Sequence, residues 1–167
     1  MPLNKVKAFL DEHHITYVVI SHSKAYTAQG IADIAHIRGQ ELAKTVIVKL
    51  DGALAMTVLP ASYQVDLLAL KKVVGVRDAA LASEREFKQH FPDCETGAMP
   101  PFGNLYGIPV YVDETLTRDT EIAFNAGTHL ELIRMSCADF ERLVKPIVLQ
   151  FSTLRPGSLD REPALVL

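Results

Sequence analysis

Residues 44–59 read KTVIVKLDGALAMTVL. Two runs rich in aliphatic and β-branched residues lie on either side of the dipeptide Asp51-Gly52. An Asp-Gly pair between two such runs is typical of a tight β-hairpin whose turn residues adopt positive φ. Pro60 follows the second run and should end it, because proline cannot donate to a β ladder. We therefore predict a two-stranded antiparallel unit at the centre of the chain.

Helix and strand signals continue on both sides of this hairpin. Before it we expect a helix, a strand and a helix opened by Thr27, at residues 3–13, 16–20 and 27–39. After it we expect a helix capped by Asp66, a strand, a helix opened by a Ser83–Glu86 capping box and another strand, at residues 66–72, 73–76, 83–90 and 110–112.

The last elements expected along the chain are a second hairpin and a helix. The strands of this hairpin are expected at 120–124 and 128–135, and the helix is expected to begin at Ser136. Side-chain alternation along the second strand predicts Leu130 and Leu132 facing inward and Ile133 facing the other way.

These elements predict an α+β fold. The expected architecture is a single domain with a mixed, largely antiparallel sheet or barrel-like core and surrounding helices. The domain should cover residues 1–152, and residues 153–167, which contain Pro156, Gly157 and Pro163, should form a C-terminal tail.

Composition narrows the class of protein. The 167 residues are 49% hydrophobic and 22% charged, which is typical of a globular chain. No apolar run approaches the roughly 18 residues that a membrane helix needs, and the two cysteines show no disulfide pattern, so we expect a reduced, cytoplasmic protein without a membrane partner. The net charge of −3 disfavours a DNA-binding surface and leaves room for contact with only a few phosphates of a nucleic acid.

The segment 97–109, GAMPPFGNLYGIP, contains three glycines and three prolines yet is rich in apolar residues. It cannot be the interior of a helix or of a central strand. Glycine permits close backbone approach and proline fixes φ, so this pattern is typical of a rigid, partly buried loop that brings backbone N–H groups close to a ligand. A purely structural crossover remains the alternative.

The sequence contains residues that are typical of three kinds of reactive site. The six histidines show no ligand spacing, so we expect neither a metal nor a cofactor. Cys94, three residues before Gly97, is a candidate nucleophile, although a lone cysteine is more often a small core residue. Lys44, at the start of an apolar strand, is either a surface residue or a charge aimed at a phosphate.

Four motifs occur in an order that resembles the YbaK/EbsC family, the editing domain associated with prolyl-tRNA synthetase. They are Ser21-His22-Ser23 after the first strand, Gly39-x4-Lys44 running into a strand, Gly97 to Gly103, and Asn125-Ala126-Gly127-Thr128-His129. Together they span about residues 1–150.

The resemblance implies a metal-independent aminoacyl-tRNA deacylase that acts in trans on a small amino acid, for example on tRNA-Pro. It places Lys44, Gly97 and Pro101 in catalysis, with Lys44 on the 3′-terminal nucleotide. It places Ala98, Met99 and Pro100 of the loop and Gly127, Thr128 and His129 of the turn around the ester. His22 and Tyr26 are further candidates for substrate contact, and the sequence leaves open which of Met56, Ile47, Phe102 and Met99 line the pocket for the amino-acid side chain. The implied partners are the 3′ end of mischarged tRNA and, as a further candidate, a tRNA synthetase.

The chemistry agrees with these residues, because an aminoacyl ester needs no strong protein nucleophile and the terminal 2′-hydroxyl or phosphate of the tRNA can position water. Two other readings stay open. One is a non-catalytic module that binds tRNA or a synthetase, and the other is a hydrolase that depends on Cys94.

Overall fold

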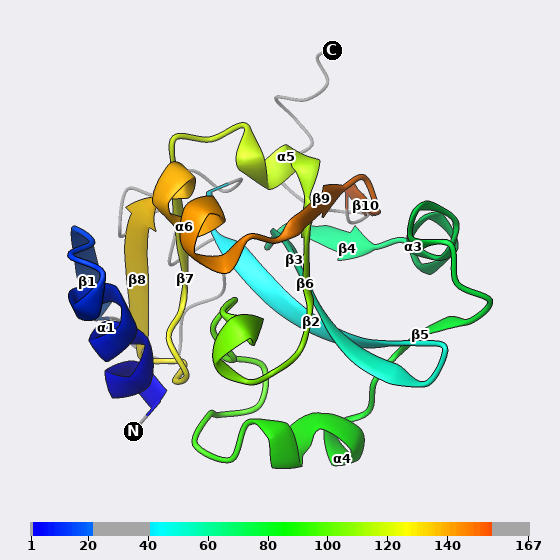
Figure 1. The fold of residues 1–167 in the computed structure, drawn as a ribbon, viewed down its shortest axis with the longest axis horizontal. Helices are drawn as coiled ribbons and strands as arrows, with labels where there is room; N and C mark the ends of the chain where they lie inside the picture. The colour runs from blue at the N-terminus through cyan, green and yellow to red at the C-terminus, as the bar shows by residue number, and fades with distance from the viewer. Residues whose placement is uncertain (1, 22–40, 155–167) are drawn as a thin grey trace.

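The computed structural model of the protein describes residues 2–21 and 41–154 (Figure 1). The predicted hairpin forms from β2 (Ala43–Leu50) and β3 (Ala53–Pro60), and Asp51 and Gly52 turn the chain with φ of 52° and 85°. The remaining strands of this sheet are β5 (Ala79–Leu81), β6 (Val110–Asp113) and β9 (Ile147–Leu149). Their order is β5-β2-β3-β6-β9, with parallel pairing of β3 to β6 and of β6 to β9.

The described residues also form two smaller antiparallel sheets. The first has the order β1-β8-β7 and consists of β1 (Tyr17–Ser21), β8 (Glu131–Ser136) and β7 (Glu121–Asn125). The second pairs β10 (Ser152–Leu154) with β4 (Tyr63–Val65). A bridge between Leu42 and Ala123 connects the start of β2 to β7. The predicted α+β fold with a mixed, largely antiparallel sheet is confirmed.

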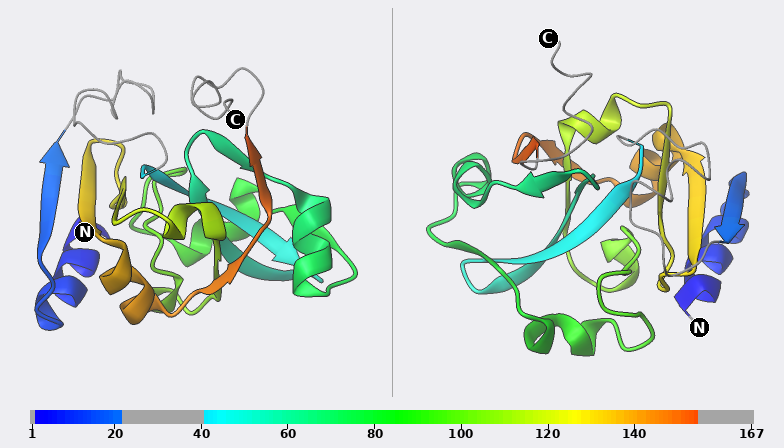
Figure 2. Two further views of the ribbon diagram at one scale, coloured as in Figure 1. Left: turned by 90° about the horizontal axis from the view of Figure 1, so that it is seen from above. Right: turned by 180° about the vertical axis from the view of Figure 1, so that it is seen from behind.

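The described helices are short and lie around the sheets. They are α1 (Pro2–Glu12), α3 (Leu67–Val74), α4 (Glu84–Phe87), α5 (Glu114–Thr117) and α6 (Cys137–Val144), with 3-10 turns at Lys88–His90 and Gly103–Leu105. Figure 2 shows α1 beside the three-stranded sheet and α3 at the opposite end of the molecule. The predicted N-caps form at Asp66, Ser83 and Ser136, and Ser83 makes the reciprocal capping box with Glu86.

The hydrophobic core divides at the five-stranded sheet. On one face Ile47 and Met56 join a large cluster built around Phe102, whose ring contacts those of Phe9, Phe124 and Phe140. On the other face Val48, Leu59, Leu70 and Phe151 form a second cluster under α3. Both faces of the sheet are therefore covered by apolar side chains.

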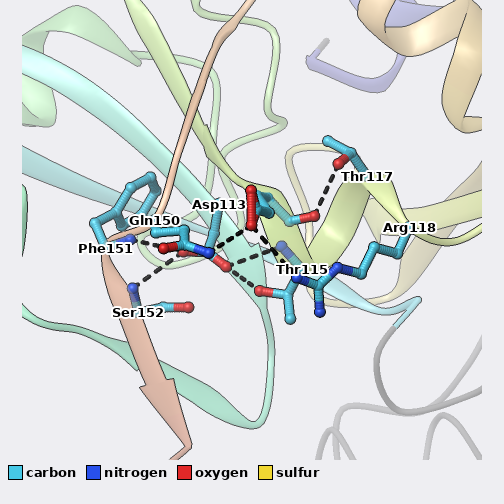
Figure 3. A network of polar contacts seen from close by, with 8 residues as sticks. Asp113, Thr115, Thr117, Arg118, Gln150, Phe151 and Ser152 are labelled. Atoms are coloured by element: carbon cyan, nitrogen blue, oxygen red, sulfur yellow. Dashed lines mark hydrogen bonds and ion pairs between the residues drawn. The ribbon is translucent and has the colours of Figure 1, made fainter. Parts of the chain in front are cut away.

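Asp113 fixes the C-terminal strands to the sheet (Figure 3). This buried carboxylate accepts the backbone N–H groups of Phe151 at 2.8 Å and Ser152 at 3.0 Å through one oxygen. Its other oxygen accepts the backbone N–H of Thr115 at 3.1 Å and the Thr115 hydroxyl. One side chain thus caps α5 and holds the start of β10.

Three local predictions were wrong. Residues 73–76 do not form a strand, because α3 continues to Val74 and ends at Gly75, whose φ of 81° caps the helix. Leu130 is 43% exposed, whereas Leu132 and Ile133 are both buried, because both faces of β8 are covered. Thr153 and Leu154, expected in a loose tail, belong to β10 and pair with β4.

Candidate functional site

The Gly- and Pro-rich segment forms a loop whose first half is buried directly after an exposed Gly97. Gly97 is exposed and has φ of 87°, whereas the next five residues, Ala98, Met99, Pro100, Pro101 and Phe102, are buried. Because a φ of this sign favours glycine, the sequence dictates where the backbone turns. The first half of the loop therefore meets solvent at Gly97, while the buried residues that follow anchor it by apolar packing.

The Gly127–His129 turn lies directly against this loop. The backbone N–H of Glu95 donates to the Gly127 carbonyl at 2.8 Å, and the N–H of Gly127 donates to the Ala98 carbonyl at 2.8 Å. The N–H of His129 donates to the Glu95 carboxylate at 2.7 Å. Two segments about 30 residues apart in sequence thus form one surface.

The ring of His129 is oriented by the loop. Its Nε2 lies 2.8 Å from the carbonyl oxygen of Thr96. Because a carbonyl only accepts hydrogen bonds, Nε2 carries the hydrogen, and Nδ1 of the neutral ring is an acceptor. A Cβ placed on Gly97 would lie 3.5 Å from Cε1 of the same ring. The imidazole therefore lies beside the exposed backbone of Gly97.

Met56, Met99 and Phe102, assigned to substrate binding by the sequence, lie in the core beneath this surface. Met56 and Phe102 are fully buried and Met99 is 4% exposed. The backbone N–H of Met56 donates to the carbonyl of Pro109 at 2.9 Å, which fixes the far end of the loop to β3. In the structure these three side chains pack in the hydrophobic core, and their direct contact with a substrate stays a prediction.

Lys44 lies elsewhere on the sheet. Alternation along β2 puts it on the face of Val46 and Val48, opposite the face of Ile47 that packs against the loop. It lines a pocket of about 230 Å³, whose other lining residues are Val46, Gln64, Val65, Leu67 and Leu81. Lys44 is the second residue of β2, and contact of one ligand with both Lys44 and the loop stays a prediction.

Two predicted substrate contacts, His22 and Tyr26, lie outside the described residues, as does Gly39 of the second motif. Thr128 is placed in the turn, where its hydroxyl accepts the backbone N–H of Leu130 at 3.3 Å. Sequence reasoning did not select Glu95, because a glutamate in a loop has no local pattern that reveals a partner 34 residues away.

Cys94 does not have the environment of a nucleophile. Its Sγ lies 3.4 Å from the hydroxyl of Tyr106, and burial raises the pKa of the thiol. A reactive cysteine needs a lowered pKa, because the thiolate is the attacking species. The cysteine hydrolase considered from the sequence is therefore disfavoured.

Within residues 2–21 and 41–154, no group of three or more His, Cys, Asp or Glu side chains is placed to hold a metal ion. In the same part of the chain, no helix is long and apolar enough to cross a membrane.

Comparison with known proteins gives a consistent result. Residues 22–143 match the family described as the aminoacyl-tRNA editing domain. The Multifunctional Ser/Thr-tRNA deacylase ProXp-y of Escherichia coli K12 is 28% identical over 149 residues, which are 86% of this chain and 89% of that protein.

Two crystal structures share the fold. The hypothetical protein APE2540 superimposes with a TM-score of 0.79 at 20% identity, over 89% of this chain and 99% of that one. A protein described as a candidate trans-editing enzyme for prolyl tRNA synthetase gives 0.78 at 19% identity, over 91% and 97%.

Proposed function

Because this chain belongs to the aminoacyl-tRNA editing domain family, we propose that it is a deacylase that hydrolyses, in trans, the ester of tRNA charged with a wrong, small amino acid. The resemblance noted from the sequence is confirmed by the match over residues 22–143. The expected enzyme class, an aminoacyl-tRNA hydrolase, is also the class of the curated relative in Escherichia coli.

The observation that carries the proposal is the joined surface of the loop and the turn. Gly97 exposes backbone at the point where the imidazole of His129 is held in one orientation. A backbone N–H directed at the oxygen of a tetrahedral intermediate contributes about 10²–10³ in rate per donor. The surface beside Gly97 is therefore the proposed place of the scissile ester.

The proposed reaction needs no protein nucleophile. Water attacks the carbonyl carbon of the ester, and the negative charge that develops on the carbonyl oxygen is stabilised by the loop. The bond from the carbonyl carbon to the ribose oxygen then breaks, and that oxygen takes a proton. The neighbouring 2′-hydroxyl or a phosphate of the tRNA orients the attacking water. Free amino acid and intact tRNA are the products.

We place Lys44 on the 3′-terminal nucleotide of the tRNA. Its pocket combines one cation with apolar walls, which suits a phosphate next to a planar base. Contact with the 3′ end alone agrees with the net charge of −3, since few phosphates need to be neutralised. A tRNA synthetase as a second partner, tRNA-Pro as the substrate and the cytoplasm as the place of action belong to the same proposal.

The identity of the amino acid is proposed from the relative, which acts on Ser- and Thr-tRNA according to its name. Serine, threonine, alanine and cysteine are therefore the side chains to compare. A pocket that recognises size alone separates side chains differing by one methylene by about 1–3 kcal/mol, so we expect related small residues to be hydrolysed at graded rates.

The test is release of amino acid from tRNA-Pro charged with serine, threonine, alanine or cysteine. We expect wild-type protein to hydrolyse at least one of these esters and Lys44→Ala to lose at least about 10-fold in kcat/KM, as one charge-assisted contact to phosphate requires. Cys94→Ser is the control and should retain activity. Binding of tRNA without any release would instead favour the non-catalytic module, and loss of activity in Cys94→Ser would favour the cysteine hydrolase.

A further inference from the structure

Glu95 joins the two halves of the proposed site. Its backbone N–H donates to the Gly127 carbonyl, and its carboxylate accepts the backbone N–H of His129 at 2.7 Å. Its own carbonyl accepts the N–H of Ala98 at 3.0 Å, which closes the turn that leads into the loop. A single residue thus contacts both the loop and the turn.

The bond to the carboxylate differs from the other contacts in its chemistry. A hydrogen bond to an ionised group is shorter and about twice as strong as one between neutral groups. His129 is held at two points. Its backbone N–H donates to the Glu95 carboxylate, and its ring Nε2 lies 2.8 Å from the Thr96 carbonyl oxygen. These two anchors leave the imidazole with one position relative to Gly97.

We propose that Glu95 is a positioning residue that sets amino-acid selectivity by holding His129 against the Gly97 loop. This inference rests on the proposed function, but it assigns a role to a residue outside the motifs of the sequence resemblance. With the turn held in place, the His129 ring stays at a fixed distance from Gly97, forms one wall of the space for the amino-acid side chain, and presents Nδ1 as an acceptor. Without the carboxylate, the wall can move away, and larger side chains gain access.

Selectivity is the property that separates this role from simple stabilisation. A variant that is only less stable has fewer active molecules, which lowers the rate for every substrate by the same factor. A wall that has moved changes the rates for small and large side chains by different factors. The ratio of kcat/KM values for two amino acids on the same tRNA therefore reports positioning, independent of the folded fraction.

The experiment measures hydrolysis of tRNA-Pro charged with alanine, serine or threonine by wild type, Glu95→Ala, Glu95→Gln and Glu114→Ala. For Glu95→Ala we expect kcat to fall by about 10- to 100-fold on the best substrate, the usual cost of a lost hydrogen bond to a charged group. KM should change by less than about threefold, since the tRNA end is held elsewhere, and the ratio between best and worst substrate should shrink by at least about fivefold.

Two variants act as matched controls. Glu95→Gln keeps an oxygen that can accept the His129 N–H, and it should restore selectivity to within about threefold of wild type. Glu114→Ala removes a carboxylate of α5 that accepts hydrogen bonds from Arg118 and Gln150 rather than from the loop or the turn, and it should leave the selectivity ratio unchanged. An unchanged ratio in Glu95→Ala, with all rates lowered equally, would overturn the inference.

Amide hydrogen exchange of His129 separates failure of the inference from failure of the proposed function. We expect slow exchange of this N–H in wild type and at least about 10-fold faster exchange in Glu95→Ala. If wild type hydrolyses none of the esters, the proposed function is wrong, and a role of Glu95 in hydrolysis is then wrong too. This holds even if hydrogen exchange shows that Glu95 contacts the His129 N–H. If wild type is active but the His129 amide exchanges equally fast in both proteins, the positioning role alone is wrong.

Discussion

Gly97→Ala separates backbone strain from the chemistry of the site. An added Cβ would lie 3.5 Å from Cε1 and 3.7 Å from Nε2 of His129, which are ordinary van der Waals distances, so the ring need not move. The cost comes from φ of 87°, because a left-handed backbone costs a residue other than glycine about 1–2 kcal/mol. Alanine also lowers the conformational entropy of the unfolded chain, which stabilises the folded protein by about 0.4–1 kcal/mol. We expect a net loss of about 1 kcal/mol.

Gly107 provides a matched control. Its φ is 73°, and a Cβ placed on it would meet nothing within 4 Å, so Gly107→Ala should have a similar strain without a neighbour at the site. For a chain of this length, a loss of about 1 kcal/mol lowers Tm by about 2–4 °C, which differential scanning calorimetry resolves. Both variants should show this shift.

Activity should distinguish the two glycines. In Gly97→Ala the strained backbone can relax and carry its N–H groups away from the ester, so we expect deacylation at 25 °C to fall by at least about 10-fold. Gly107→Ala should retain wild-type kcat, since at 25 °C both variants remain folded. Equal activity of the two variants, or a large loss of stability in Gly97→Ala alone, would refute the reasoning that Gly97 is where the loop meets the substrate.

Two further predictions concern stability. Asp113→Ala removes the carboxylate that accepts the Phe151 N–H and the other hydrogen bonds described above, so the free energy of unfolding of this variant, measured in urea, should fall by about 3 kcal/mol. Asp113→Asn should lose less, because one oxygen remains as an acceptor. Lys49 holds the pKa of Glu86 at about 2, below the ordinary 4.5, so this carboxylate contributes stability above about pH 4.5 that is lost as the pH falls towards 2. The Tm difference between wild type and Glu86→Gln should therefore narrow on acidification over that range and, because the pair is at the surface, also in high salt. A Tm difference between these two proteins that stays constant with pH would contradict the lowered pKa of Glu86.

The sequence by itself determined the features that depend on neighbours a few residues apart. The turn at Asp51 and Gly52 and the caps at Asp66, Ser83 and Ser136 all formed as predicted, because each rests on φ preference or on a hydrogen bond within one helical turn. The ordered motifs were also sufficient to identify the family.

Only the tertiary structure decided how these pieces meet. The strands β4, β5, β9 and β10 have three residues each, too few for a hydrophobic period. β5 and β9 add to the edges of the longer strands β2 and β6, whereas β4 and β10 pair with each other. Likewise, the contact of Glu95 with His129 joins residues 34 positions apart. The face on which Lys44 lies follows from the register of β2 on β3, which is a property of the folded sheet. Residue types and order are local information, whereas which carboxylate meets which N–H depends on the packing of the whole domain.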